Sequence, residues 1–276
     1  MFYNIIRKND NMKRRVIASD LDGTLLNSFS EIPKSTYDYL VHLKDEGHIL
    51  AIASGRVLMS SLMITKGADF AKYIVSDTGA LIYDKVNKRV VYEKSIPNDI
   101  VKELCDKYIK YCKRISLGTI NNHMIYTNED YQEHDYSKKI ENINKFYKEH
   151  NSVFHISFKA DNNVINDLYE DILFNYPDYE VYLMQDSYSD KKWVELVCKG
   201  VSKFNAIKHI CEIEDISVED AITFGDGMND IDMIKNVGTG VAMNGALDIV
   251  KNGAKYVTSS NDHEGIKEFL INYLEK

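Results

Sequence analysis

A short apolar strand that runs directly into two carboxylates is the feature that most constrains this chain. Residues 16–24 are Val-Ile-Ala-Ser-Asp-Leu-Asp-Gly-Thr, which predicts a buried strand followed by a turn at Gly23. Side chains two residues apart on an extended chain point to the same side, so Asp20 and Asp22 are expected to share a face unless the turn rotates the second one. Like charges this close repel, and a hard cation such as Mg²⁺, which prefers oxygen ligands, would relieve the repulsion. An ordinary acidic turn is the alternative interpretation, since Asp and Gly are common turn residues.

The segment that follows completes a β-α-β pattern. A polar loop leads to Pro33, which favours the first turn of a helix, and Gly47 is placed to end that helix. A second apolar strand, Ile49–Ala53, ends in Ser54 and Gly55. This alternation predicts an α/β fold with a doubly wound, Rossmann-like parallel sheet, and such sheets bind ligands at the carboxyl ends of their strands.

The sequence changes character between two parts of this predicted sheet. Residues 85–192 combine short strands and helices without regular alternation, which predicts an inserted α+β domain. The parallel-sheet domain is expected to comprise residues 12–84 and 193–276, because its apolar strands resume at residues 193–197. Residues 1–11 are polar and are interpreted as an N-terminal extension.

A second acidic cluster follows another buried strand. Residues 225–230, Gly-Asp-Gly-Met-Asn-Asp, place Asp226 and Asp230 at the start of a predicted helix, where the helix dipole favours negative charge. Simple helix capping is the alternative to a ligand site. The glycines on both sides of Asp226 favour the ligand site, because they let the backbone approach a ligand closely. Two acidic strand ends in one sheet predict a cation site.

Lys203 is a third candidate. It stands at the start of a predicted helix, where a positive charge opposes the helix dipole. Locally unfavourable residues of this kind are expected at functional sites, although a solvated surface lysine is the alternative interpretation.

Composition argues against several classes of function. The 276 residues carry a net charge of −8, which argues against a general nucleic-acid binder, because that affinity comes from clustered Lys and Arg. No stretch approaches the length that spans a bilayer, and the N-terminus lacks the apolar core of a signal peptide, so a cytoplasmic location is expected. The cysteines lack zinc-ligand spacing, and reduced, mostly buried thiols are expected at Cys105, Cys112, Cys198 and Cys211.

In their order along the chain, these motifs resemble those of the haloacid dehalogenase-like (HAD) superfamily of phosphohydrolases. The matching motifs are Asp20-Leu21-Asp22-Gly23-Thr24, then Ser54, then Lys203, then Gly225-Asp226-Gly227-Met228-Asn229-Asp230. The large insertion between the second and third motifs resembles that of the Cof-type subfamily, whose insertion is a C2 cap. The similarity runs from about residue 12 to the C-terminus, so a HAD core with an inserted α+β cap is the expected architecture.

The resemblance also implies roles for the candidate residues. Asp20 would be the nucleophile that forms an aspartyl phosphate, and Asp22 would be the general acid for the leaving oxygen and then the base for water. Lys203 would complete the catalytic group. The groups expected to bind the phosphoryl oxygens are Ser54, the backbone N–H of Gly55, Asn229 and Lys203. The residues expected to hold Mg²⁺, the implied cofactor, are Asp20, Asp22 through its backbone carbonyl, Asp226 and, through water or by orienting its neighbours, Asp230.

Two stretches depart from the family pattern. Residues 78–80 are Thr-Gly-Ala where the family commonly has Asn-Gly-Ala, and residues 243–246 are Met-Asn-Gly-Ala where it often has Met-Gly-Asn-Ala. Neither change removes a catalytic group, but both affect the expected shape of the pocket rim. Cap residues that could line the pocket, each with an ordinary core or surface position as the alternative, are His123, Tyr126, His155, Lys159, Tyr182 and Tyr188.

The resulting hypothesis is a hydrolase, a Mg²⁺-dependent phosphatase of small phosphorylated metabolites, with sugar phosphates as the leading substrate class. A phosphotransferase or hexose-phosphate mutase with the same chemistry is one alternative, and a metabolite-binding regulator with little turnover is another. A haloalkanoic dehalogenase fits less well, because Asp22 suits protonation of an ester leaving group. The expected partner is the small phosphorylated substrate, with no nucleic acid or membrane, and a monomer or homodimer is expected.

Overall fold

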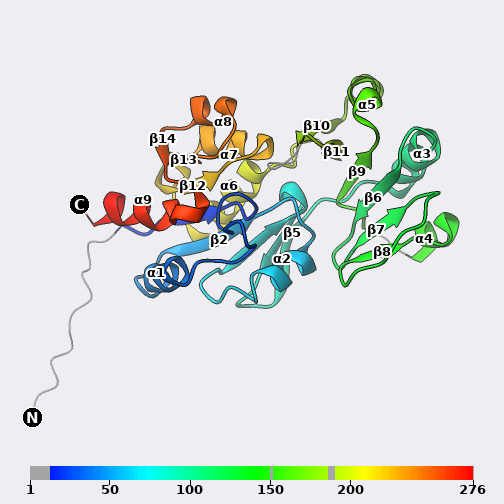
Figure 1. Cartoon of the computed structure of the whole chain (residues 1–276). Helices are drawn as coiled ribbons and strands as arrows, with labels where there is room; N and C mark the ends of the chain where they lie inside the picture. The colour runs from blue at the N-terminus through cyan, green and yellow to red at the C-terminus, as the bar shows by residue number, and fades with distance from the viewer. Residues whose placement is uncertain (1–12, 150–151, 186–189, 276) are drawn as a thin grey trace, which may run out of the picture.

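The computed structural model describes residues 13–149, 152–185 and 190–275, which form two β-sheets with helices around them (Figure 1). In spatial order, the strands of the larger, eight-stranded sheet are β14 (Tyr256–Thr258), β13 (Thr239–Met243), β12 (Ile222–Gly225), β1 (Val16–Ser19), β2 (Ile49–Ala53), β3 (Tyr73–Ser76), β4 (Leu81–Asp84) and β5 (Arg89–Glu93). Neighbouring strands are parallel from β14 to β3, whereas β4 and β5 add an antiparallel edge.

Helices cover both faces of the larger sheet, which confirms the α/β, doubly wound architecture. One face packs against α1 (Lys34–Asp45), α2 (Leu58–Ile64) and α9 (Gly265–Leu274), and the other against α6 (Lys203–Glu214), α7 (Ile231–Asn236) and α8 (Asp248–Gly253). Strand β2 illustrates the division: Leu50 and Ile52 join the buried cluster that contains Leu43 of α1, while Ala51 joins the cluster that contains Ile207 of α6. Because successive side chains alternate between faces, an all-apolar strand such as β2 suits a sheet buried on both sides.

The smaller sheet lies beside the larger one and carries its helices on one face (Figure 1). Its strands are, in spatial order, β10 (Tyr179–Gln185), β11 (Lys192–Cys198), β9 (His155–Lys159), β6 (Arg114–Gly118), β7 (His123–Tyr126) and β8 (Ser137–Lys139), and its helices are α3 (Asn98–Tyr108), α4 (Ile143–Glu149) and α5 (Asn162–Asn175). Leu117, Phe158 and Leu196 of this sheet are buried in one cluster with Val101 of α3 and Leu168 of α5. Short 3-10 turns complete the described elements: η1 (Asp77–Gly79), η2 (Val218–Asp220), η3 (Met228–Asp230) and η4 (Asn261–His263).

The pairing of two strands, one near each predicted boundary, differs from the domain division predicted at residues 85 and 193. Strand β5, predicted to belong to the insertion, pairs with β4 in the larger sheet, and β11, predicted to reopen the parallel-sheet domain, lies between β10 and β9 in the smaller sheet. The chain passes from one sheet to the other between Lys94, whose backbone N–H donates to the oxygen of Ala80 just before β4, and Ile96, which pairs with Val153. It returns after Cys198. The cause is that an apolar strand is compatible with any buried sheet position and does not encode its partner. The predicted extension, residues 1–11, lies outside the described residues.

Other features match the sequence analysis. Cys105, Cys198 and Cys211 are buried, Cys112 is half-buried, and all four, which lie within the described residues, are free thiols. None of the described helices is both long enough and apolar enough to cross a bilayer.

A close contact at Gly79 links the two halves of the larger sheet's domain. The residue has a φ of +105°, and a Cβ there would lie 2.2 Å from the backbone oxygen of Ser202, just before α6. Gly79→Ala is therefore expected to lower the free energy of unfolding by about 2–4 kcal/mol, through both backbone strain and overpacking. Gly47→Ala is the control, because Gly47 has a φ of +99° with no atom within 4 Å of the added Cβ. Equal losses of stability for the two variants in urea unfolding would contradict the importance of the contact.

Candidate active site

Two parallel strands bring residues 20 and 226 together at their carboxyl ends. Strands β1 and β12 pair in parallel, with Ser19 opposite Phe224, and the backbone N–H of Asp20 donates to the Phe224 oxygen at 3.0 Å. Asp20 and Asp226 follow these strands directly. Thr24 donates its hydroxyl to Oδ1 of Asp226 at 2.6 Å, which ties the turn after β1 to the turn after β12. The motifs that contain Asp20 and Asp226 therefore meet at one edge of the larger sheet, as predicted.

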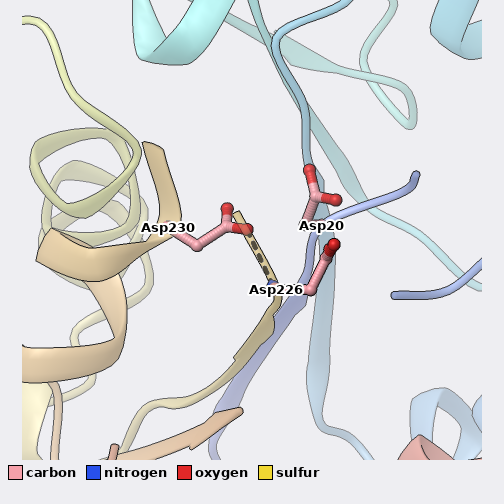
Figure 2. A group of neighbouring side chains, drawn as sticks. All are labelled: Asp20, Asp226 and Asp230. Atoms are coloured by element: carbon pink, nitrogen blue, oxygen red, sulfur yellow. Dashed lines mark hydrogen bonds between the residues drawn. The ribbon is translucent and has the colours of Figure 1, made fainter. Parts of the chain in front are cut away.

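The loop after β12 holds Asp230 in a fixed orientation. Oδ2 of Asp230 accepts the backbone N–H groups of Asp226 at 3.0 Å and Gly227 at 2.9 Å. A Cβ at Gly225 would lie 2.5 Å from the Asp230 Cβ, so only glycine fits there. Figure 2 shows the carboxylates of Asp20, Asp226 and Asp230 directed toward a common space, with the bond from the Asp226 backbone dashed. Asp230 therefore has the capping role that the sequence offered as one alternative, and the ligand site stays a prediction.

Lys203 lies beneath these carboxylates and is completely buried. Helix α6 begins at this residue because the Ser202 side chain accepts from the N–H of Asn205, a regular N-cap bond. Nζ of Lys203 donates to Oδ1 of Asp20 at 2.5 Å and to Oδ1 of Asp230 at 2.6 Å. The alternative of a solvated surface lysine is therefore wrong.

Burial and charge oppose each other in this group. Burial raises the pKa of Asp20 well above its usual range, against the opposing effect of the Lys203 ammonium, and the nearby carboxylates of Asp230 and Asp226 raise it further. Burial alone would lower the pKa of Lys203, but the carboxylates of Asp20 and Asp230 more than compensate, so the pKa of Lys203 is raised and the ammonium is retained.

The three carboxylates fit a divalent cation. Asp20, Asp226 and Asp230 each offer an oxygen, and these atoms lie within 4.8 Å of one another. With all three ionised, one lysine leaves two formal negative charges uncompensated in a buried place, which is costly without a counter-ion. Gly23, with a φ of +81°, brings its backbone so close that a Cβ would lie 2.4 Å from Oδ2 of Asp226. Hard carboxylate oxygens of this kind suit Mg²⁺.

The side chain of Asp22 points in a different direction from that of Asp20. Its carboxylate, whose side chain is 51% exposed, accepts Nε and Nη2 of Arg56, each at 2.7 Å. The turn at Gly23 has thus rotated it away from the buried acidic group, although both aspartates line the same cavity. Its predicted role as a metal ligand through the backbone carbonyl stays a prediction.

The remaining motif residues line the same cavity of about 730 Å³. Ser54, Gly55 and Asn229 all contribute to its wall. A Cβ at Gly55 would lie 3.5 Å from Oγ1 of Thr78 and 3.6 Å from Nδ2 of Asn229, so these side chains stand directly beside the glycine backbone. Ser54, Gly55 and Asn229 are therefore gathered with Asp20 and Asp22 around one space, whereas the fully buried Lys203 is not among the described residues that line it.

The smaller sheet forms the opposite wall of this cavity. Among the predicted cap residues, His123, His155 and Lys159 line it. Tyr126 and Tyr182 are not among the described residues that do, and Tyr188 lies outside the described residues.

Sequence reasoning missed several cavity residues. It gave no role to Arg56, although this residue directly follows Ser54 and Gly55 at a strand end. It also missed Glu195, whose signal was an acidic residue at the centre of the apolar run Trp-Val-Glu-Leu-Val. The smaller sheet further contributes Arg114, Ser116, Ser157 and Trp193.

Comparison with known proteins agrees with this fold. The family model for haloacid dehalogenase-like hydrolases matches residues 17–270, and the chain belongs to that family, as a Cof-type member. A 5-amino-6-(5-phospho-D-ribitylamino)uracil phosphatase of Bacillus subtilis is 27% identical over 284 residues, covering 95% of this chain and 98% of the relative. A putative phosphatase of Haemophilus influenzae is 30% identical over 272 residues, covering 94% and 97%. The crystal structure of a haloacid dehalogenase-like hydrolase from Bacteroides thetaiotaomicron is similar with a TM-score of 0.80 and 26% identity, covering 94% and 99%. The protein is a phosphatase enzyme of this family.

The Asp22–Arg56 pair generates a first prediction about activity. Arg56→Ala removes both donors that hold the carboxylate of Asp22, the residue predicted from the sequence to transfer protons, and misplacement of a reacting group by about 1 Å costs roughly a hundredfold in rate. We expect kcat/KM for p-nitrophenyl phosphate to fall by about ten- to a hundredfold. Arg89→Ala, which removes an exposed arginine on β5, is the matched control. Equal activity of the two variants would mean that the pair has no catalytic consequence.

Lys203 generates a prediction about stability. Lys203→Met leaves the buried carboxylates of Asp20 and Asp230 without their cation, which typically costs about 3–5 kcal/mol. We expect chemical unfolding in EDTA to show this loss in the free energy of unfolding of the variant. Added Mg²⁺ is expected to raise the free energy of unfolding more in the variant than in the parent protein. Lys208→Met, on the exposed side of α6, is the control. A variant as stable as the parent in EDTA would contradict this account of the ion pair.

Proposed function

We propose that this phosphatase hydrolyses small phosphorylated metabolites of the sugar or polyol phosphate class, with Mg²⁺ as cofactor and an aspartyl phosphate on Asp20 as intermediate. The observation that carries the proposal is the buried Asp20 carboxylate beside Lys203, in the wall of a cavity that Asp22 also lines. A buried nucleophile paired with a cation and facing a polar cavity suits attack on an anionic ester.

The chemistry divides between the two aspartates. A carboxylate oxygen of Asp20 attacks phosphorus, the bond from phosphorus to the ester oxygen breaks, and that oxygen takes a proton from Asp22. Water then attacks the phosphorus of the acyl phosphate while Asp22 takes a proton from it, and the bond from phosphorus to the Asp20 oxygen breaks, releasing inorganic phosphate. Arg56 holds the Asp22 carboxylate at the cavity wall between these proton transfers.

The phosphoryl oxygens meet a set of donors around the same space. Ser54, the backbone N–H of Gly55, Asn229 and Lys203 are the groups we assign to them. Donors that are already oriented lower the barrier, because the transition state spreads its charge over these oxygens.

Mg²⁺ would be held by Asp20 and Asp226, with the Asp22 carbonyl, and with Asp230 orienting its neighbours. Asp230 suits an orienting role because its two oxygens already accept Lys203 and two backbone N–H groups. The cation supplies charge neutralisation for the phosphoryl group and the nucleophile.

The substrate class rests on the cavity and on a relative. The cavity of about 730 Å³ accommodates a small metabolite, and its smaller-sheet wall carries hydroxyl, imidazole and carboxylate groups. The Bacillus subtilis relative is named for a substrate with a phosphorylated ribityl chain. A cytoplasmic location, a monomeric or homodimeric state and no nucleic-acid or membrane partner complete the proposal.

Substitution of the two aspartates tests the mechanism. We expect Asp20→Asn to lower Mg²⁺-dependent phosphate release by more than about a thousandfold, because the covalent nucleophile is lost. We expect Asp22→Asn to accumulate phosphoenzyme from p-nitrophenyl phosphate, because this leaving group needs no acid, whereas the attack of water on the phosphoenzyme lacks its base. Intact-protein mass spectrometry measures the phosphoenzyme. Asp38→Asn, an exposed aspartate on α1, is the control.

Three results would contradict the proposal. Near-normal phosphate release by Asp20→Asn would exclude the aspartyl phosphate. A phosphorylated product in place of free phosphate, on supplying a sugar acceptor, would identify a phosphotransferase or mutase. Tight binding of a phosphorylated metabolite with negligible hydrolysis would identify a regulator.

A further inference from the structure

One face of the smaller sheet is polar where it meets the cavity. Along β6, β9 and β11 the side chains alternate, and the apolar set packs against the helices. The other set lines the cavity and consists of Arg114, Ser116, His155, Ser157, Lys159, Trp193 and Glu195. Such a face is unusual for a buried sheet, since buried polar groups are costly unless they bind partners.

Glu195 stands at the centre of this face, in a row of hydroxyl groups. In the strand register Glu195 lies opposite Ser157, and Ser157 lies opposite Ser116. These three side chains are all buried, with 5% to 7% of their surface exposed. A carboxylate flanked by hydroxyls accepts hydrogen bonds from hydroxyl groups and disfavours a second anion.

Two residues of this face are held by the larger sheet through η1. Thr78 donates its hydroxyl to Oε1 of Glu195. Nδ1 of His155 pairs with Oδ1 of Asp77 at 2.8 Å, with both side chains buried. These bonds leave Oε2 of Glu195 and Nε2 of His155 as the atoms for a ligand in the cavity.

The contacts around η1 are close and its backbone is strained, which is typical of an arrangement maintained for function. Asp77 and Thr78 both have positive φ, 52° and 59°. A Cβ at Gly118 would lie 2.3 Å from the His155 ring and 2.5 Å from Asp77 Oδ1, so glycine is needed there. Residues held in this region of backbone space typically cost about 1–3 kcal/mol each, and they cluster at functional sites. Thr78 stands where the family commonly has Asn, so this loop belongs to the departures noted in the sequence.

Thr78 also places Glu195 close to the phosphate end of the cavity. Its Oγ1 lies beside Gly55, at 3.5 Å from the position of a Cβ there. Gly55 is one of the groups assigned to the phosphoryl oxygens. Thr78 thus connects Glu195 to the part of the cavity lining where the phosphate is proposed to bind.

Charge favours His155 as a donor. Burial works to lower the pKa of His155, but the hydrogen bond and charge of Asp77 raise it above its usual value, and burial raises the pKa of Asp77. The bond to Asp77 keeps Nδ1 of His155 occupied.

We propose that Glu195 and His155 bind hydroxyl groups of the carbon chain that carries the phosphate, and that Thr78 and Asp77 are positioning residues for them. The ligand class is a linear or cyclic polyol phosphate, with Oε2 of Glu195 accepting from one hydroxyl and Nε2 of His155 bonding to another. This inference rests on the proposed phosphatase function and names the residues that determine its specificity.

Two esters with the same number of carbons test it: D-ribitol 5-phosphate and n-pentyl phosphate, each with Mg²⁺. The measured quantity is the ratio of kcat/KM for the first ester to kcat/KM for the second. In Glu195→Gln this ratio is expected to fall by about ten- to a hundredfold, as for loss of a hydrogen bond to a charged group. Glu170→Gln, an exposed glutamate on α5, is the matched control and keeps the parent ratio.

The positioning role is tested at Thr78. Thr78→Val is expected to lower the same ratio by a smaller factor, and Thr78→Ser, which retains the hydroxyl, to restore it. The double variant Thr78→Val/Glu195→Gln is expected to fall no further than Glu195→Gln, because both act through one carboxylate. A merely structural defect would lower kcat/KM for both esters equally, and melting temperatures identify any variant that fails to fold.

The outcomes separate the two proposals. If the parent protein with Mg²⁺ hydrolyses neither ester nor p-nitrophenyl phosphate, the phosphatase function itself fails. If it hydrolyses them and Glu195→Gln leaves the ratio unchanged, or lowers both rates alike, the hydroxyl-binding role is wrong. If the parent prefers 5-aminopentyl phosphate to D-ribitol 5-phosphate, Glu195 binds a cation and the polyol class is overturned.

Discussion

The buried ion pair of Lys203 with Asp20 and Asp230 is the interaction on which the acidic edge of the larger sheet depends. A fully buried ammonium is tolerable only where carboxylates compensate its lost hydration, and it donates to both of them at 2.5 and 2.6 Å. This requirement joins three segments far apart in the chain: the end of β1, the loop after β12 and the start of α6. A change in any one of them would leave a buried charge without its partner.

The same constraint explains which parts of the site could be predicted. Asp20 and Asp226 follow apolar strands, and parallel strands bring their carboxyl ends to one edge, so their meeting follows from pattern alone. Lys203 was predictable because it opposes the dipole of its own helix. The direction of the Asp22 side chain was not, because it depends on the turn at Gly23 and on the salt bridge to Arg56.

The predictions from sequence were weakest for strand pairing. The run that forms β11 is apolar enough for a central strand of either sheet, and its pairing with β10 and β9 comes from tertiary packing. Glu195 lies within this run, so the error in the boundary and the missed cavity residue have one cause. An acidic side chain in a central strand is acceptable only if that face lines a polar cavity, and sequence periodicity alone does not say which face does.

In the proposed function, the two sheets divide the work on a substrate between them. Asp20, Lys203 and their neighbours would contact the phosphate, which all substrates of this chemistry share, and the polar face of the smaller sheet would contact the group to which the phosphate is attached. Because side chains alternate along β6, β9 and β11, residues such as Ser116 and Ser157 can change without altering the apolar face that packs on the helices. Thr78 is the exception, since its hydroxyl donates to Glu195 and stands beside Gly55, one of the groups proposed to bind the phosphoryl oxygens. In this proposal, a change of substrate class requires the η1 loop to change together with the smaller sheet.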